Sequence, residues 1–350
     1  MNDIAISFCI PTYNRAQGVY KQVTDILKCS DSDIEVVVLD NGSTDETLNI
    51  LRAIKDDRLF VYGNGENKGV LYNALHVINK GKGKFVFFSL DKDCIDPKAI
   101  GDFKLFLLRD ASLACGYCEH NSQSKAEFEL FSKGYPAVKE IAYKAQHPTG
   151  YFFNNKLLKS TNFVERFSDQ GFVDTFPFDF VFAELCLLGD GAIYHKPMCT
   201  LQTVYMAAKQ KSFGTNGKSK DAYFLPQGKL KMAINFTRHI NTLKLPAREK
   251  ELLIIDRFMQ GLVAATMGYK SMMKSNEMCT HYHMESRNVG WKEMFVIGLN
   301  FYKQFIKGTR SVWGGNLLTQ SKFIIHLSIT LFRKAIKRFF IAARRFRIVV

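Results

Sequence analysis

Four short apolar runs separated by three helical patterns constrain the fold of the first 110 residues more than any other feature of this chain. The runs are residues 4–10, 34–39, 59–62 and 84–90. Apolar runs of this length are typical of strands buried on both faces of a sheet. Because these strands alternate with helices, the segment predicts an α/β fold with a mostly parallel central sheet flanked by helices.

The composition excludes several classes of protein. Of the 350 residues, 47% are apolar, so the chain can bury a sizeable core and disorder is excluded as its main state. No charge-free run of about 18 apolar residues occurs, and the N-terminus lacks the pattern of a secretory signal. The eight cysteines are scattered apart from Cys115 and Cys118. We therefore expect reduced, packed thiols in a cytoplasmic protein, and not disulfides or half of a zinc site.

Charge is distributed unevenly along the chain, whose formal net charge is +15. Residues 1–110 carry 14 basic and 16 acidic side chains, a balance of −2, whereas residues 294–350 carry 11 basic and no acidic ones, a balance of +11. This asymmetry predicts a catalytic or binding domain joined to a segment that seeks an anionic surface. We expect a first domain over 1–205 and a basic, mainly helical region over 206–350. Helical patterns in that region cover residues 226–243, 247–275, 291–307 and 319–347.

Polar side chains gather where the predicted strands end. Thr12 and Arg15 follow the first strand, Asp40 ends the second, and Asp91 and Asp93 follow the fourth. The carboxyl ends of parallel strands meet at one edge of a sheet, and ligands bind in the crevice outside that edge. Since a stable fold does not require this clustering, it predicts a binding site.

Four segments stand out together, namely residues 8–15, 36–45, 67–69 with Asn73, and 87–93. They resemble glycosyltransferase family 2, the inverting enzymes that use nucleotide-sugar donors and have a GT-A fold. They occur in the family's order and spacing, and the resemblance covers roughly residues 4–200. Each segment is weak by itself, whereas four in register are specific. The resemblance implies a nucleotide-sugar donor, a GT-A catalytic domain and a divalent cation.

Asp91 and Asp93 match the DxD motif of the family. Mg²⁺ and Mn²⁺ prefer carboxylate oxygens and keep phosphate oxygens in their shell, so such a pair suits a leaving diphosphate. By resemblance, Asp93 binds the metal directly, and Asp91 contacts it through water or contacts the ribose. The alternative is a pair of solvated aspartates in a turn.

The resemblance also assigns a nucleotide pocket. Asp40 would accept hydrogen bonds from a uracil N3–H or a ribose hydroxyl, although it could be a turn residue before a helix. Ser43 fits the N-cap of a capping box better than a ligand, and Asp45 fits either role. Many members have arginine where this chain has Tyr72, and Lys68 is a partial substitute. The other residues expected to line the pocket are Pro11, Thr12, Tyr13, Arg15, Asn67 and Gly69.

An inverting transfer needs a base to remove the proton of the acceptor hydroxyl. In the family this base is a carboxylate at the start of a helix, and Asp179 aligns with it. Phe178 replaces the first acid of the usual pair, and an apolar collar would raise the pKa of Asp179. The alternative is a simple helix N-cap. Asp174 and Glu184 are weaker candidates for the base.

Three further residues are candidates for the acceptor side or the metal. His147 and Gly150 lie in a His-Pro-Thr-Gly segment that precedes a predicted strand, where family members approach their sugars. Turn chemistry explains this segment equally well. His195 could be a third metal ligand, and the competing interpretation is an ordinary core or surface histidine.

The end of the chain is a basic amphipathic pattern over 319–347. Phe332, Phe339 and Phe346 lie on one face of the predicted helix, whereas Arg333, Lys337 and other cations occupy the opposite face. Such helices lie in anionic membrane interfaces. The alternative is a helix that packs its apolar stripe on the protein.

These observations predict a cytoplasmic inverting glycosyltransferase, peripheral on the inner face of the plasma membrane, that needs Mn²⁺ or Mg²⁺. It would move a sugar from a nucleotide-sugar donor, with UDP favoured, to a glycan or lipid-linked acceptor of a bacterial surface polysaccharide such as capsule or O-antigen. Two rivals stay open: a non-catalytic nucleotide-sugar-binding scaffold, and a nucleic-acid-binding protein that uses the basic tail. Nucleic acid is not the expected partner, because the aromatics of the tail are not interleaved with its cations.

Overall fold

The structure is a computed structural model that describes residues 3–144, 146–167, 177–201, 222–313, 321–325, 327 and 329. The chain divides into two compact units, Met1–Thr215 and Asn216–Val350. The expected domain boundary between residues 205 and 206 and most of the expected helix over 319–347 lie outside the described residues, so both stay predictions.

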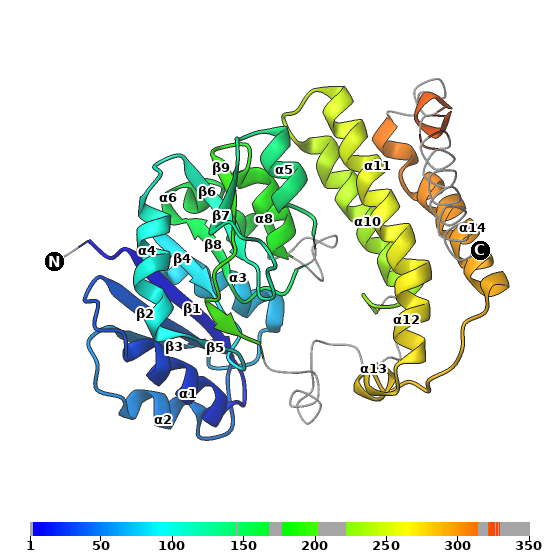
Figure 1. Cartoon of the computed structure of the whole chain (residues 1–350). Helices are drawn as coiled ribbons and strands as arrows, with labels where there is room; N and C mark the ends of the chain where they lie inside the picture. The colour runs from blue at the N-terminus through cyan, green and yellow to red at the C-terminus, as the bar shows by residue number, and fades with distance from the viewer. Residues whose placement is uncertain are drawn as a thin grey trace, which may run out of the picture. The chain divides into compact units, whose positions relative to one another are not determined.

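The first unit is built around an eight-stranded sheet of order β3-β2-β1-β4-β8-β6-β9-β7 (Figure 1). All strands except β8 and β7 run in the same direction, which follows from their pairings. The sheet is therefore mostly parallel, as predicted. The strands in sheet order are β3 (Leu59–Gly63), β2 (Ile34–Asp40), β1 (Ile6–Thr12), β4 (Phe85–Phe88), β8 (Tyr151–Asn154), β6 (Leu113–Cys118), β9 (Asp190–Tyr194) and β7 (Phe128–Phe131).

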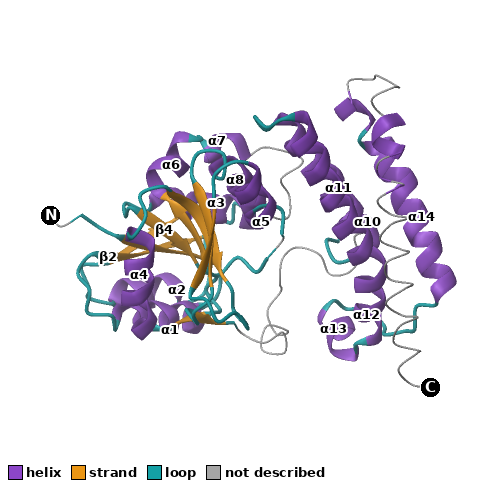
Figure 2. Ribbon diagram, turned by 45° about the horizontal axis from the view of Figure 1, so that its top comes forward, coloured by secondary structure: helices purple, strands orange, loops and turns teal. Residues whose placement is uncertain are grey.

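Helices flank this sheet on both faces (Figure 2), which explains why every residue of β1 and β2 is buried. An aromatic cluster fills one side of the core, where the Phe103 ring meets those of Phe87, Phe152 and Tyr194 at centroid distances of 5.0–5.6 Å. The helices of this unit are α1 (Ala16–Leu27), α2 (Thr47–Ala53), α3 (Val70–Lys80), α4 (Ile100–Leu108), α5 (Tyr135–Ile141), α6 (Asn155–Ser160), α7 (Phe163–Phe167) and α8 (Pro177–Leu185). A short helical turn, η1 (Pro97–Ala99), precedes α4, and a two-stranded ribbon pairs β5 (Cys94–Ile95) with β10 (Cys199–Thr200).

The capping-box prediction at Ser43 is wrong. Helix α2 begins only at Thr47, and its N-cap residue Glu46 makes no side-chain cap. Asp45 accepts a hydrogen bond of 3.0 Å from the amide of Thr47 and so performs the turn role at this helix start. The hydroxyl of Ser43 instead donates a hydrogen bond to Asp40, at the end of β2.

The second unit is helical in its described part, as predicted. A long helical hairpin joins α10 (Pro226–Thr242) to α11 (Ala247–Val263), and a π-helical turn, η2 (Ala264–Gly268), continues α11. None of the helices among the described residues is both long and apolar enough to cross a membrane. The remaining elements are α12 (Tyr269–Lys274), α13 (Asn276–His281), α14 (Trp291–Gly308) and η3 (Arg310–Trp313).

Candidate active site

The ends of β1 and β2 place Thr12 between two of the predicted carboxylates. Thr12 and Asp40 are direct partners in the parallel ladder, and Asp40 is in turn the partner of Gly63 at the end of β3. The hydroxyl of Thr12 donates to Asp91 Oδ2 over 2.9 Å. Thr12, Asp40 and Asp91 are all buried. Residues that are 79 positions apart in the sequence therefore meet at the carboxyl edge of the sheet.

A tight turn after β2 fixes the carboxylate of Asp40. Asp40 Oδ2 accepts hydrogen bonds from the amides of Gly42 and Ser43, at 3.1 and 2.9 Å. The hydroxyl of Ser43 also donates to Asp40 and accepts from the amide of Asn14, at 2.8 Å. Asn14 adopts a φ of 50°, and its side-chain oxygen accepts from the amide of Thr44. These hydrogen bonds join the loops after β1 and β2, residues 13–15 and 41–46, which we call the rim.

Asparagine side chains attach the glycine-containing loop after β3 to the same rim. Asn67 Oδ1 accepts hydrogen bonds of 2.9 Å from Asn41 Nδ2 and from the amide of Gly69. Asn41 Oδ1 in turn accepts from the amide of Lys68 over 3.0 Å, and the Lys68 ammonium lies 5.1 Å from the ring centroid of Tyr72. The ammonium of Lys68 therefore lies beside Tyr72, which stands where many family members have arginine.

Asp91 combines burial with a neighbouring cation. Arg15 Nη1 lies 3.5 Å from Asp91 Oδ1. Burial raises the pKa of Asp91 to about 6, although the charge of Arg15 and the hydrogen bond from Thr12 oppose the rise. Arg15 Nη1 is itself buried and has no hydrogen-bond partner within the described part of the chain. An orphaned guanidinium nitrogen beside a carboxylate is suited to a phosphate oxygen.

Asp93 is 1% exposed and is held by the segment that leads into β8. The hydroxyl of Thr149 donates to Asp93 and accepts from the amide of Leu90 over 3.0 Å. His147 Nε2 lies 3.6 Å from Asp93 Oδ2, and burial lowers the pKa of His147 to about 4, against the effect of the aspartate. His120 stacks edge-on beside His147 at a centroid distance of 5.8 Å. The sequence interpretation missed Thr149 and His120 as neighbours of Asp93, because the antiparallel pairings of β8 with β4 and with β6 bring them there.

Asp179 lies in the first turn of α8 and is 2% exposed. Asp179 Oδ1 accepts a hydrogen bond of 3.0 Å from the amide of Lys144. Its neighbour Phe178 packs on Phe88, the last residue of β4, at a ring distance of 4.7 Å. The segment that begins at Lys144 therefore contacts Asp179 at one end and, through its His147 and Thr149, Asp93 at the other.

The weaker candidates for the base differ in placement. Glu184 forms an ion pair with Arg166, whose Nη1 lies 2.6 Å from Glu184 Oε2. Asp174 lies outside the described residues. Of the two described candidates, Asp179 is therefore the one whose contacts lead to the segment that holds Asp93.

Gly150 directly precedes β8, and His195 directly follows β9, with β6 between these two strands. Gly150 has a φ of 98°, and its carbonyl accepts from the amide of Cys118 over 2.9 Å. His195 Nδ1 lies 2.8 Å from Glu119 Oε2, and its Nε2 lies 3.5 Å from Glu129 Oε1. Glu129 lies in β7, and Glu119 directly follows β6. The acidic neighbours of His195 are therefore these glutamates and not the aspartates near β4. Cys115 and Cys118 are buried free thiols, as predicted.

The donor set at this edge bears on whether a divalent cation can bind. Within the described ranges, no three His, Cys, Asp or Glu side chains are grouped to hold a metal. Two buried carboxylates, Asp91 and Asp93, are nevertheless what Mg²⁺ and Mn²⁺ require when phosphates and water supply the remaining ligands. The residues present therefore fit a cation that binds together with a diphosphate.

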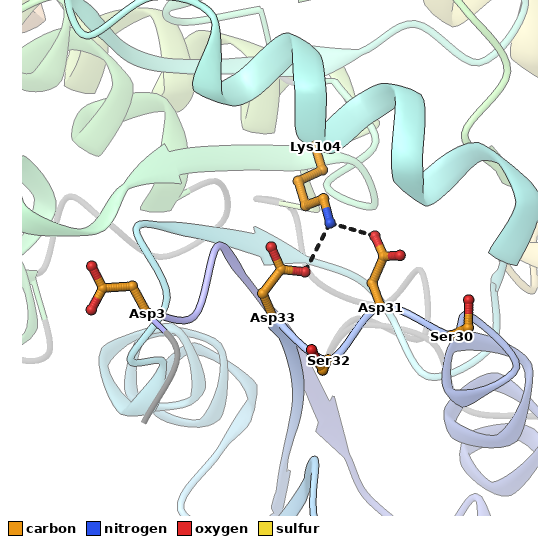
Figure 3. Close-up of a pocket in the computed structure, with 6 residues that line it drawn as sticks. All are labelled: Asp3, Ser30, Asp31, Ser32, Asp33 and Lys104. Carbon is orange, nitrogen blue, oxygen red and sulfur yellow. Dashed lines mark hydrogen bonds and ion pairs between the residues drawn. The ribbon is translucent and has the colours of Figure 1, made fainter.

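A shallow pocket lies at the opposite, amino edge of the sheet (Figure 3). Its lysine, Lys104, reaches across to Asp31 and Asp33, with 2.8 Å between Lys104 Nζ and Asp33 Oδ1. Because Asp33 directly precedes β2, this pocket is remote from the carboxyl edge. The remaining lining residues are Asp3, Ser30 and Ser32.

Comparison with known proteins identifies the class of the first unit. Residues 7–170 match the family model described as glycosyl transferase family 2. This match agrees with the resemblance that the four motifs predicted. Residues 1–349 of S. aureus TarS, solved in complex with UDP-GlcNAc, have a similar fold, with a TM-score of 0.54 at 14% identity over 88% of this chain and 92% of that one. The predicted GT-A fold is thereby confirmed.

Two curated relatives add particular activities. WfaP of Escherichia coli, a UDP-Glc:alpha-D-GlcNAc-diphosphoundecaprenol beta-1,3-glucosyltransferase, is 32% identical over 88 residues, which are 25% of this chain and 35% of that protein. A GalNAc(5)-diNAcBac-PP-undecaprenol beta-1,3-glucosyltransferase of Campylobacter jejuni is 26% identical over 171 residues, which are 46% of this chain and 55% of that protein. The chain thus spans less than two thirds of the length of either relative.

Proposed function

We propose that this protein is an inverting glycosyltransferase that takes its sugar from a nucleotide diphosphate donor, with UDP as the nucleotide. The acceptor is a hydroxyl of a glycan or of a lipid-linked sugar in bacterial surface polysaccharide synthesis, such as that of capsule or O-antigen. The match to the family model, the UDP-GlcNAc bound by TarS and the undecaprenol-linked substrates named for the two relatives support these choices.

One observation carries the proposal. Asp40 on one side and Asp91 with Asp93 on the other are buried carboxylates from two distant parts of the chain, and the sheet gathers them at its carboxyl edge. Burying carboxylates is unfavourable unless they are paired or bind a cation. This edge therefore has the chemistry that holds a charged ligand.

In this proposal the rim binds the donor. Asp40, fixed by its turn, accepts hydrogen bonds from the base or the ribose. Arg15 offers its orphaned nitrogen to a phosphate oxygen. Asp93, together with Asp91, would hold Mn²⁺ or Mg²⁺. The cation neutralises charge on the departing diphosphate when it is bound.

Asp179 is the proposed general base. It lies at the start of a buried helix, next to Phe178 and beside the segment that holds Asp93. In the proposed reaction the carboxylate of Asp179 accepts the proton of the acceptor hydroxyl. The loss of that proton strengthens the oxygen as a nucleophile while it attacks the anomeric carbon from the face opposite the diphosphate, which inverts the configuration.

Substitution of the base tests the assignment. Asp179→Asn keeps an oxygen that accepts from the amide of Lys144, so the fold and donor binding survive, whereas transfer falls about 100-fold or more, the usual contribution of such a base. Transfer is measured with a panel of UDP-sugars and mixed lipid-linked acceptors. Unchanged turnover would remove Asp179 from its role, and the absence of any transfer by the unmodified chain would favour the scaffold interpretation.

We further propose that the protein is peripheral on the cytoplasmic face of the plasma membrane and that the basic tail over 319–347 contributes to this location. The lipid-linked acceptors named for the two relatives give a reason for it. Nucleic acid is not proposed as a partner. Loss of vesicle binding on substitution of the tail arginines tests the role of the tail, and retained binding to DNA with no vesicle binding would contradict it.

A further inference from the structure

The outer face of α14 exposes large apolar side chains in the second unit. Trp291, Phe295 and Leu299 follow one another at four-residue spacing, so they form a line along the helix. Their exposed fractions are 69%, 66% and 42%, and the adjacent Val296 is 54% exposed. Exposed tryptophan and phenylalanine one turn apart are costly on a surface that meets only water.

The core of the unit does not use this face. Phe301 and Phe305 lie on the inner side of α14, are buried, and pack against Phe258 of α11 at ring distances of 5.6 and 4.8 Å. Figures 1 and 2 both show α14 beside the α10–α11 hairpin. The contacts between α14 and α11 in the core therefore do not involve the side chains of Trp291 or Phe295.

The π-helical turn after α11 extends the exposed apolar surface. Gly298 of α14 faces Thr266, whose Cγ2 lies 3.6 Å from the position that a Cβ on the glycine would take. Met267, directly after Thr266, is 53% exposed, and Val263 is 37% exposed. We call the following residues the α14 patch: Val263, Met267, Trp291, Phe295, Val296 and Leu299.

Positive charge accompanies the patch. The line from Trp291 to Leu299 continues at the same spacing to Lys303, which is exposed, and then to Lys307 in the last turn of the helix. The one acid at the start of the helix, Glu293, is neutralised by Arg287, with 2.6 Å between Arg287 Nη2 and Glu293 Oε1. From residue 294 to the end, the sequence has no acidic residue.

We propose that the α14 patch docks on a lipid bilayer with anionic headgroups. The apolar line begins at Trp291 and is followed by Lys303 and Lys307. This arrangement is complementary to such a surface, because aromatic rings enter the interface and cations meet the anionic headgroups. A protein partner with a matching apolar groove would not require the lysine extension. The docking site lies in a different segment of the sequence from the tail over 319–347. It deepens the membrane location given under the proposed function, and its biological purpose rests on that proposal.

The fluorescence of Trp291 tests directly whether α14 contacts the bilayer. The chain has two tryptophans, so Trp313→Phe leaves Trp291 as the single probe in an otherwise complete protein. On addition of vesicles of phosphatidylcholine with phosphatidylglycerol, the emission of Trp291 shifts to shorter wavelength and is quenched by brominated lipid. In the same background, Phe295→Ser with Leu299→Ser raises the lipid concentration needed for half-binding roughly 30-fold, because two partly inserted side chains are lost.

Two controls accompany this experiment. Leu105→Ser in α4 removes an apolar side chain that is 68% exposed but belongs to the first unit, and it leaves binding unchanged. Lys303→Gln with Lys307→Gln weakens binding to the anionic vesicles about tenfold and leaves binding to pure phosphatidylcholine unchanged. Equal urea midpoints show that the variants fold.

Three outcomes would overturn the proposal. The chain could sediment with vesicles while Trp291 emission stays unchanged, so that another segment carries the binding. It could fail to bind vesicles at all. It could form a dimer that Phe295→Ser and Leu299→Ser dissociate, so that a second copy covers the patch. None of these measurements involves sugar transfer, so failure of the proposed activity would be seen separately, as absent turnover.

Discussion

Gly42 offers the sharpest test of how the rim is built. Its φ is +75°, and a Cβ at this position would lie 2.5 and 2.7 Å from the backbone C and Cα of Glu66. Backbone atoms cannot swing aside as a flexible side chain can, so Gly42→Ala must displace the loop after β3. The amide of Gly42 also donates to Asp40, so the displacement disturbs the carboxylate.

The expected loss of unfolding free energy in Gly42→Ala has two separable contributions. The left-handed conformation costs an alanine about 1–2 kcal/mol. Overlap with fixed neighbours adds about 1–3 kcal/mol. Gly65 is a matched control, because it has the same φ of +75° and no atom lies within 4 Å of the position that a Cβ would take there. Gly65→Ala therefore loses only the first contribution.

Urea denaturation of both variants separates these contributions. We expect Gly42→Ala to lose about 2–5 kcal/mol of unfolding free energy and Gly65→Ala about 1–2 kcal/mol. Calorimetric titration with UDP should show weaker binding for Gly42→Ala only. Equal losses of stability in the two variants, with equal affinity for UDP, would refute the close approach of the two loops.

Two further substitutions probe side-chain contacts. Thr149→Val leaves a carboxylate oxygen of Asp93 and the amide of Leu90 without this partner, so it should lower the free energy of unfolding in urea by about 2–4 kcal/mol. Thr149→Ser keeps the hydroxyl and should keep most of the stability. Equal losses in the two variants would show that the hydroxyl is not the stabilising group. A hydrogen bond from Arg58 lowers the pKa of Asp56 below 3.8, so this aspartate stabilises the fold above the unfolded-state pKa, and the stabilisation is lost as the pH falls through the lower folded-state value. The stability difference between the unmodified chain and Asp56→Asn should therefore shrink below about pH 4, and a difference that grows there would reverse the sign of the argument.

The central strands were predictable because their signal is local. Buried parallel strands need apolar side chains on both faces, and β1, β2 and β4 each carry such a run. By contrast, β7 is only partly buried and lies at the edge of the sheet, so its sequence carries no comparable pattern. The two-residue strands β5 and β10 depend on pairing between segments about 100 positions apart and leave no local trace.

The candidate site was predictable in composition but not in its contacts. Topology alone places Asp40 and Asp91 at one sheet edge once the strands are known. The pairing of Thr149 with Asp93 requires β8 to run antiparallel beside β4, which no local pattern specifies. The capping-box error at Ser43 has a similar origin, because the serine hydroxyl donates to Asp40 and accepts from the amide of Asn14, which is 29 positions away.

The most direct test of the account is calorimetric titration of UDP in the presence and absence of Mn²⁺. Asp93→Asn is compared with Asp56→Asn, which makes the same change of charge beside β3 at the amino edge of the sheet. The account predicts that Mn²⁺ strengthens UDP binding to the unmodified chain and to Asp56→Asn, and that Asp93→Asn loses about tenfold or more of this affinity. Equal affinities of Asp93→Asn and the unmodified chain would contradict the claim that the carboxyl edge of the sheet binds the donor.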